Sequence, residues 1–114
     1  MYALSLLALL LPLAAANTHN QCDCMSWSDG QPWIHNAELT QWVCQSFYPN
    51  KGRWDASSKR CVATNGQFDG DTWEGYCKAA GQSGYHKIKP NGLGEATGPI
   101  LKVGAAAGSC PDKV

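Results

Sequence analysis

The fold is decided by residues 22–77, whose sequence is CDCMSWSDGQPWIHNAELTQWVCQSFYPNKGRWDASSKRCVATNGQFDGDTWEGYC. This stretch holds five of the six cysteines and all five tryptophans of a 114-residue chain. Most of the cysteines that could form disulfides and most of the bulky apolar side chains therefore fall in one region. We expect this region to form the core, with a targeting segment before it and a tether after it.

The first sixteen residues, MYALSLLALLLPLAAA, have the form of a secretory signal peptide. An apolar run from Leu4 to Leu13 leads into alanines at 14–16, which fit the small-residue pattern of a cleavage site. We predict that residues 1–16 are removed after Ala16. A membrane anchor is the alternative, but a span needs about 20 apolar residues and this run is shorter. We therefore expect the mature protein to be secreted and extracellular, without membrane insertion.

Six cysteines in a short secreted chain indicate a disulfide framework, because a core of this size rarely supplies enough stability alone. The pairing stays open, except that Cys22 and Cys24 are too close to bridge each other. A zinc site on these two would need two further ligands at suitable spacing, and we do not expect one. The expected disulfide cysteines are Cys22, Cys24, Cys44, Cys61, Cys77 and Cys110.

The charges of the chain are balanced, with nine Lys and Arg against nine Asp and Glu. They are spread along both halves without a run of one sign. Nucleic-acid binding and cationic membrane disruption both need a basic excess, so neither is expected. We expect a monomer whose partner is an extracellular protein or polysaccharide.

A first helix is predicted over residues 36–48. Asn36 is suited to cap its start, and apolar side chains recur at four-residue steps from Leu39 to Phe47. The helix should end at Tyr48, because a residue that precedes proline is disfavoured in the helical region.

A second helix is predicted over residues 70–80. Asp71 to Glu74 has the acid-x-x-Glu form of a capping box, and Gly81 stands where a left-handed C-terminal cap favours glycine. Asp69-Gly70-Asp71 also resembles the start of a calcium loop, but the ligand spacing stops after two carboxylates. We interpret these carboxylates as helix caps.

Less regular segments surround the two helices. Residues 17–35 read as a turn-rich arm pinned by Cys22 and Cys24, and Arg53-Trp54 with residues 60–63 form a short hairpin held by Cys61. Residues 87–114 are rich in Gly, Ala and Pro, which predicts a loop or flexible tail tethered by Cys110, with only residues 100–103 suited to a short strand. The expected fold is a small disulfide-rich α+β domain over 17–86, mainly α with a minor hairpin.

Four segments between about residues 22 and 86 together form a loose pattern. They are Cys22-Asp23-Cys24, Asn36-Ala37-Glu38-Leu39-Thr40 leading to Val43-Cys44, the stretch from Trp54 to Cys61, and Tyr76-Cys77 followed by Gly81. This order resembles a broad group of small secreted cysteine-rich proteins of ascomycete fungi, often named candidate effectors. The resemblance implies a secreted, non-catalytic protein that acts outside the cell.

The sequence departs from this group where relatives have the first cysteine of two Cys-Cys pairs. Val43 and Tyr76 stand at those positions. If the two cysteines pair with each other in relatives, Val43 and Tyr76 should form an apolar contact between the helices. The relatives' late cysteine near Gly84 is also absent, and the resemblance implies that Cys110 substitutes for it.

An enzyme has little support in this sequence. Three histidines are present, His19, His35 and His86, with acids such as Glu38. However, neither a Gly-x-Ser-x-Gly elbow nor a His-Glu-x-x-His motif accompanies them. We expect no catalytic residue, no metal site and no cofactor, and a small secreted hydrolase or a protease inhibitor is less favoured.

The tryptophans divide into two groups. Trp42 and Trp73 lie on the apolar rows of the predicted helices, so we expect them in the core. Trp27, Trp33 and Trp54 lie in turn-rich segments and are candidate ligand-binding residues, because exposed indoles stack on sugars or anchor protein interfaces. The favoured function is a non-enzymatic interaction protein, a candidate fungal effector. The alternative is a module that binds a wall polysaccharide such as chitin.

Overall fold

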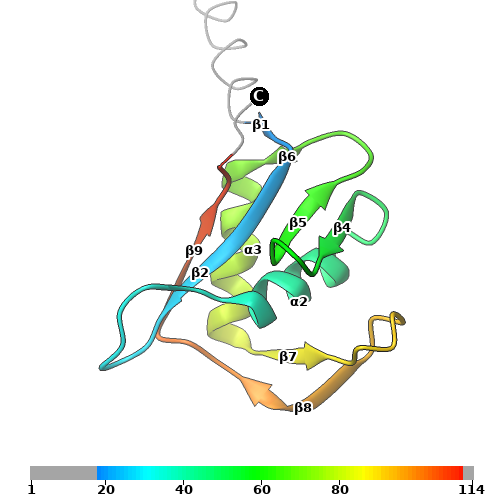
Figure 1. The fold of residues 1–114 in the computed structure, drawn as a ribbon. Helices are drawn as coiled ribbons and strands as arrows, with labels where there is room; N and C mark the ends of the chain where they lie inside the picture. The colour runs from blue at the N-terminus through cyan, green and yellow to red at the C-terminus, as the bar shows by residue number, and fades with distance from the viewer. Residues whose placement is uncertain (1–17, 112–114) are drawn as a thin grey trace, which may run out of the picture.

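The structure, a computed structural model, describes residues 18–111. The signal peptide predicted at residues 1–16 lies outside these residues. The described chain is a small disulfide-rich α+β domain with two helices, as expected (Figure 1). Strands make up 38% of it and helices 27%, so the prediction of a mainly α domain is wrong. Most strands are short and lack the alternating apolar pattern that reveals a strand in a sequence.

Strand β2, Gln21–Trp27, organises a five-stranded antiparallel sheet. The strand order is β3-β2-β5-β4, and β9 also pairs with β2. Both β3 and β9 pair with the same two residues, Met25 and Ser26, so they lie on opposite edges of β2. The bounds are β3 Ile34–His35, β4 Gly52–Asp55, β5 Arg60–Ala63 and β9 Ala105–Ser109. The segment expected as an irregular arm therefore contains the strand at the centre of the sheet.

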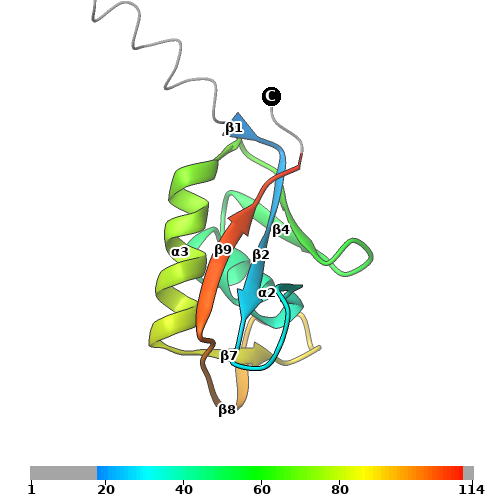
Figure 2. The same cartoon turned by 90° about the vertical axis from the view of Figure 1, so that its left-hand side faces the viewer.

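Two smaller sheets complete the strand content. They pair β1, Thr18–His19, with β6, Phe68–Asp69, and β7, Tyr85–Ile88, with β8, Ala96–Leu101. The prediction of a loop or flexible tail is wrong for residues 96–99 and for β9, while the short strand predicted at 100–103 overlaps the end of β8. The small side chains of β9 let this strand lie directly against the second helix (Figure 2).

Helix α2 spans Ala37–Phe47, which confirms the first predicted helix. Asn36 is its N-cap, and Oδ1 of this side chain accepts a hydrogen bond from the Leu39 amide at 2.9 Å. Tyr48 is the C-cap, so the helix ends before Pro49 as expected.

Helix α3 spans Gly70–Ser83 and is three residues longer than predicted at its C-terminal end. Its N-cap is Asp69, so the capping box predicted from Asp71 is wrong. Asp69 accepts hydrogen bonds from the Thr72 hydroxyl at 2.7 Å and amide at 2.9 Å, which hold the pKa of its carboxyl below 3.8. Gly84 rather than Gly81 is the C-cap, with a positive φ of 127°. Gly81 is instead buried within the helix.

The hairpin predicted between the helices is confirmed as β4 and β5. The Asp55 carboxylate accepts a hydrogen bond from the Ser58 hydroxyl at 2.6 Å, which closes the turn and lowers the pKa of Asp55. As expected, Cys61 ties this hairpin to a helix, through a bridge to Cys44 on α2.

All six cysteines are paired. The bridges are Cys22–Cys110, Cys24–Cys77 and Cys44–Cys61. They join β2 to the residue after β9, β2 to α3, and α2 to β5. Cys110 therefore tethers the C-terminal stretch to the domain, as predicted.

The core lies between the sheet and the two helices, around fully buried Trp73. The Trp73 indole Nε1 donates a hydrogen bond to the Asp23 carbonyl at 2.7 Å, which confirms a core position. Trp42 is only partly buried, against the same core.

Tyr76 stacks on Phe47, with ring centroids 4.3 Å apart, so α3 meets α2 one turn beyond Val43. Direct contact between Val43 and Tyr76 stays a prediction.

Candidate functional site

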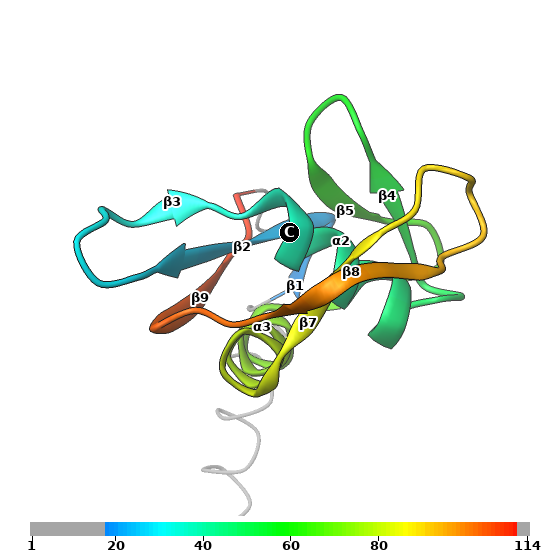
Figure 3. The same ribbon diagram turned by 90° about the horizontal axis from the view of Figure 1, so that it is seen from below.

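The most exposed aromatic surface lies on the β2–β3 hairpin. Trp27 ends β2 and is 37% exposed. Trp33, just before β3, and Ile34, the first residue of β3, are 50% and 51% exposed. We name these three residues the hairpin patch. Ser26 pairs with Ile34 across the hairpin, so Trp27 and Trp33 are the next two facing positions toward the turn. The hairpin extends away from the body of the domain on one side (Figure 3).

A polar cluster holds the base of this hairpin. The carboxylate of Asp23, on β2, is almost fully buried. Its Oδ2 accepts a hydrogen bond from Arg60 Nε at 3.2 Å and lies 3.0 Å from His35 Nδ1. The other ring nitrogen of His35 lies 2.8 Å from the carbonyl oxygen of Lys59. These contacts join β2, β3 and β5, so they fix the direction in which the hairpin points.

Hydrogen bonds of Asn36 also connect the hairpin to the rest of the domain. While its oxygen caps α2, its Nδ2 donates to Ser26 Oγ and to Tyr85 OH, each at 3.0 Å. The Cys24–Cys77 bridge also anchors β2 to α3. Buried hydrogen bonds and a disulfide therefore hold the hairpin that presents the hairpin patch in place on the domain.

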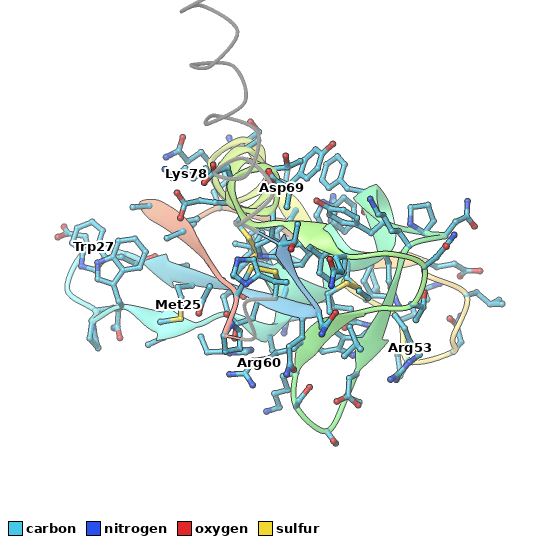
Figure 4. All side chains as sticks on the ribbon, turned by 90° about the horizontal axis from the view of Figure 1, so that it is seen from above. Met25, Trp27, Arg53, Arg60, Asp69 and Lys78 are labelled. Atoms are coloured by element: carbon cyan, nitrogen blue, oxygen red, sulfur yellow. A yellow bond between two sulfur atoms is a disulfide. The ribbon has the colours of Figure 1, made fainter. Side chains whose placement is uncertain are left out.

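Trp54 lies elsewhere, in a groove of about 720 Å³. Three parts of the chain form most of its walls. They are α2 through Gln41 and Gln45, β4 through Arg53 and Trp54, and the end of β7 with the β7–β8 loop over residues 88–94. We name this hollow the Trp54 groove. Figure 4 shows Trp27 and Arg53 at opposite ends of the domain. The structure thus brings Trp27 and Trp33 together but separates Trp54 from them.

The walls of the Trp54 groove mix apolar and polar groups. Trp54 is partly buried against the core, and Leu93 from the loop is 73% exposed. Oε1 of Gln45 is buried and accepts no hydrogen bond from any residue in the described part of the chain.

A second, smaller hollow of about 190 Å³ lies beside α3, lined by His19, Asp71 and Glu74 among others. Glu74 is already engaged, because Oε2 accepts from the Gly108 amide at 3.2 Å and Oε1 pairs with Lys78. Within residues 18–111, no group of three or more His, Cys, Asp or Glu side chains is placed to hold a metal ion. The acids near the start of α3 act in capping and pairing.

Sequence reasoning found the tryptophans but missed most of their surroundings. Ile34 follows Trp33 directly, yet a lone isoleucine in a turn-rich segment carries no signal for a surface site. Gln41 and Gln45 lie one turn apart on α2, and this spacing marks a polar helix face without indicating what faces it. The loop that completes the Trp54 groove lies in the segment that the sequence predicts to be a tail.

Comparisons with models of protein families, with curated proteins and with solved structures find no match for this chain. Among the described residues, no helix is long and apolar enough to cross a membrane. The class that the structure defines is therefore a small α+β domain with three disulfides, of the kind that oxidising compartments favour.

Proposed function

We propose that this protein is a secreted, non-enzymatic interaction protein, which binds another extracellular protein through the hairpin patch. The proposal includes membership of the small cysteine-rich candidate effectors of ascomycete fungi that the sequence resembles. The observation that carries it is the exposure of Trp27, Trp33 and Ile34 on one supported hairpin.

Exposed large apolar side chains on one face mark interaction surfaces, and the register places Trp27 and Trp33 on the same face of the hairpin, with Ile34 on the other face. Tryptophan is enriched among the residues that contribute most to protein interfaces, because a buried indole contributes a large contact area. The support of the hairpin adds to this, since a surface already held in place loses little conformational entropy on binding. His35 supplies that support through its hydrogen bond with the Lys59 carbonyl, and Asn36 through those with Ser26 and Tyr85.

A protein partner is favoured over a flat polysaccharide by the placement of the tryptophans. Stacking along an extended glycan surface would use several indoles on one face. Trp54 instead lies in a groove at the other end of the domain from Trp27. Three disulfides in a domain of this size support action outside the cell.

The proposal is tested by crosslinking followed by measured affinity. A photo-reactive side chain at Gln31, in the exposed turn of the hairpin, should crosslink the mature protein to a partner among extracellular proteins. With that partner purified, the Trp27→Ala and Trp33→Ala double variant should bind at least about tenfold more weakly than the wild type.

The matched control is Ile100→Ala, which removes a similarly exposed apolar side chain from β8 and should leave this affinity unchanged. Mature protein is incubated in parallel with insoluble chitin and cellulose. Retention on either polymer that the double variant loses would contradict a protein partner and favour the polysaccharide-binding alternative.

A further inference from the structure

The Trp54 groove has the size and composition of a ligand site that is separate from the hairpin patch. Its volume of about 720 Å³ is in the range of pockets that hold small organic molecules. Trp54 offers an aromatic surface, and Leu93 lies on the wall formed by the β7–β8 loop. An apolar wall next to polar groups suits a ligand that has both apolar and hydroxyl-bearing faces.

The polar groups of the groove match sugar hydroxyls. The amides of Gln41 and Gln45 each contain a donor and an acceptor, and a sugar hydroxyl does both. The Gln45 Oε1 is buried without a donor from the described residues. Because this oxygen is buried, a sugar hydroxyl in the groove reaches it only when the Gln45 side chain rotates outward.

The charged side chains that line the groove are basic, which favours an anionic ligand. Two cations, Arg53 and Lys89, line it, and no lining residue is acidic. Lys89 is already paired with Glu95 at 3.3 Å. Arg53 is exposed, and no carboxylate among residues 18–111 lies within salt-bridge distance of it. A guanidinium binds a carboxylate through two parallel hydrogen bonds, so Arg53 is suited to a carboxylate on the ligand.

We propose that the Trp54 groove binds an acidic oligosaccharide composed of uronic acid units. The sugar rings lie against Trp54, the hydroxyls reach Gln41 and Gln45, and one carboxylate pairs with Arg53. This site is independent of the hairpin patch, so the protein has a glycan site and a protein site at opposite ends.

Calorimetric titration of the mature, oxidised protein with tetragalacturonic acid tests the charge selection. We expect tetragalacturonic acid to bind measurably. The methyl-esterified tetramer and chitotetraose should bind at least about tenfold more weakly, because neither offers a carboxylate to Arg53. Absence of binding, or equal affinity for the acid and its methyl ester, would overturn the proposal.

Arg53→Gln removes the same interaction from the protein side and should weaken binding at least about tenfold. The control is Lys78→Gln, which removes one positive charge from an exposed site on α3 and should leave the affinity unchanged. Equal weakening in both variants would show only a general charge effect and would overturn the role of Arg53.

The indole N–H signals in a ¹⁵N-labelled sample locate the ligand, with Trp54→Phe used to assign one of them. Tetragalacturonic acid should shift the Trp54 signal and leave those of Trp27 and Trp33 in place. Shifts at Trp27 and Trp33 without one at Trp54 would overturn the groove as the site. Binding at Trp54 with no protein partner at the hairpin would instead contradict only the function proposed above.

Discussion

At the scale of single residues, Tyr48 shows how packing changes a side chain's chemistry. Its ring meets Phe68 edge-on at 5.0 Å between centroids and Trp73 at 5.5 Å. Its hydroxyl is buried, with no hydrogen-bond partner among the described residues. Burial, followed by the charges of Tyr76 and Asp69, raises the pKa of Tyr48 from 10.0 to about 12.

Replacement of Tyr48 by Phe should therefore cost no stability. A buried polar group without a partner costs about 1–3 kcal/mol, so we expect Tyr48→Phe to match or exceed the wild type in unfolding free energy at neutral pH. Urea unfolding of the oxidised proteins measures this. A loss of 1 kcal/mol or more, on the order of one hydrogen bond, would mean that the hydroxyl has a stabilising partner.

The raised pKa also predicts a loss of stability in alkali. Below pH 10.0 the phenol is protonated in both the folded and the unfolded state, so it gives no pH dependence. Between 10.0 and about 12 only the unfolded state ionises, which favours unfolding as the pH rises. In this window Tyr48→Phe should lose less stability than the wild type, as followed by urea unfolding.

At the scale of elements, the contact of β9 with α3 depends on a missing side chain. A Cβ on Gly108 would lie 2.9 Å from the Cα of Glu74 and 2.9 Å from Cδ1 of Trp73. The nearest obstacle is the helix backbone, which has no rotamer through which it can move away. Gly108 also faces Cys24 across the β2–β9 pair, so the sheet and the helix are held together at this point.

We expect Gly108→Ala to destabilise the protein by about 1–3 kcal/mol, the usual range for overpacking a close contact. The control is Gly75→Ala, on α3 beside Glu74, where an added Cβ meets nothing within 4 Å. Alanine there should stabilise the helix by up to about 1 kcal/mol. Thermal unfolding of both variants checks this, and a Gly108→Ala variant as stable as the wild type would contradict the close packing.

At the scale of the whole molecule, the three bridges join β2 to the residue after β9 and tie both helices to the sheet. The longest, Cys22–Cys110, spans 88 positions of the sequence and the shortest, Cys44–Cys61, spans 17. Longer loops lose more entropy in the unfolded chain when they are closed. Each bridge contributes about 2–4 kcal/mol, so the three together are comparable with the whole stability of a small domain.

Reduction should therefore unfold the protein. We expect the near-ultraviolet circular dichroism of the buried tryptophan to disappear on treatment with dithiothreitol under otherwise native conditions. Alkylation of the reduced thiols followed by the same measurement excludes reoxidation. A reduced, alkylated protein that keeps its near-ultraviolet signal would show that the core folds without the bridges.

The features that the sequence determined by itself are local ones. Asn36 and Pro49 delimit α2 because a cap and a proline act on their own turn of backbone. The β4–β5 hairpin, the framework of six paired cysteines and the core position of Trp73 also follow from patterns within a few residues. The acid-x-x-Glu pattern predicts the α3 cap at Asp71, but the cap is Asp69, because any aspartate can cap a helix and the pattern does not show where the helical backbone begins.

The tertiary structure alone decided the pairing of the cysteines, the strand β9 and both candidate sites. β9 reads Ala-Ala-Ala-Gly-Ser, which has no apolar alternation, and it becomes a strand because β2 supplies its hydrogen bonds from the other end of the chain. The Trp54 groove likewise needs α2, β4 and the β7–β8 loop to meet. Such features depend on contacts between distant residues, and local propensity does not encode which distant residues will meet.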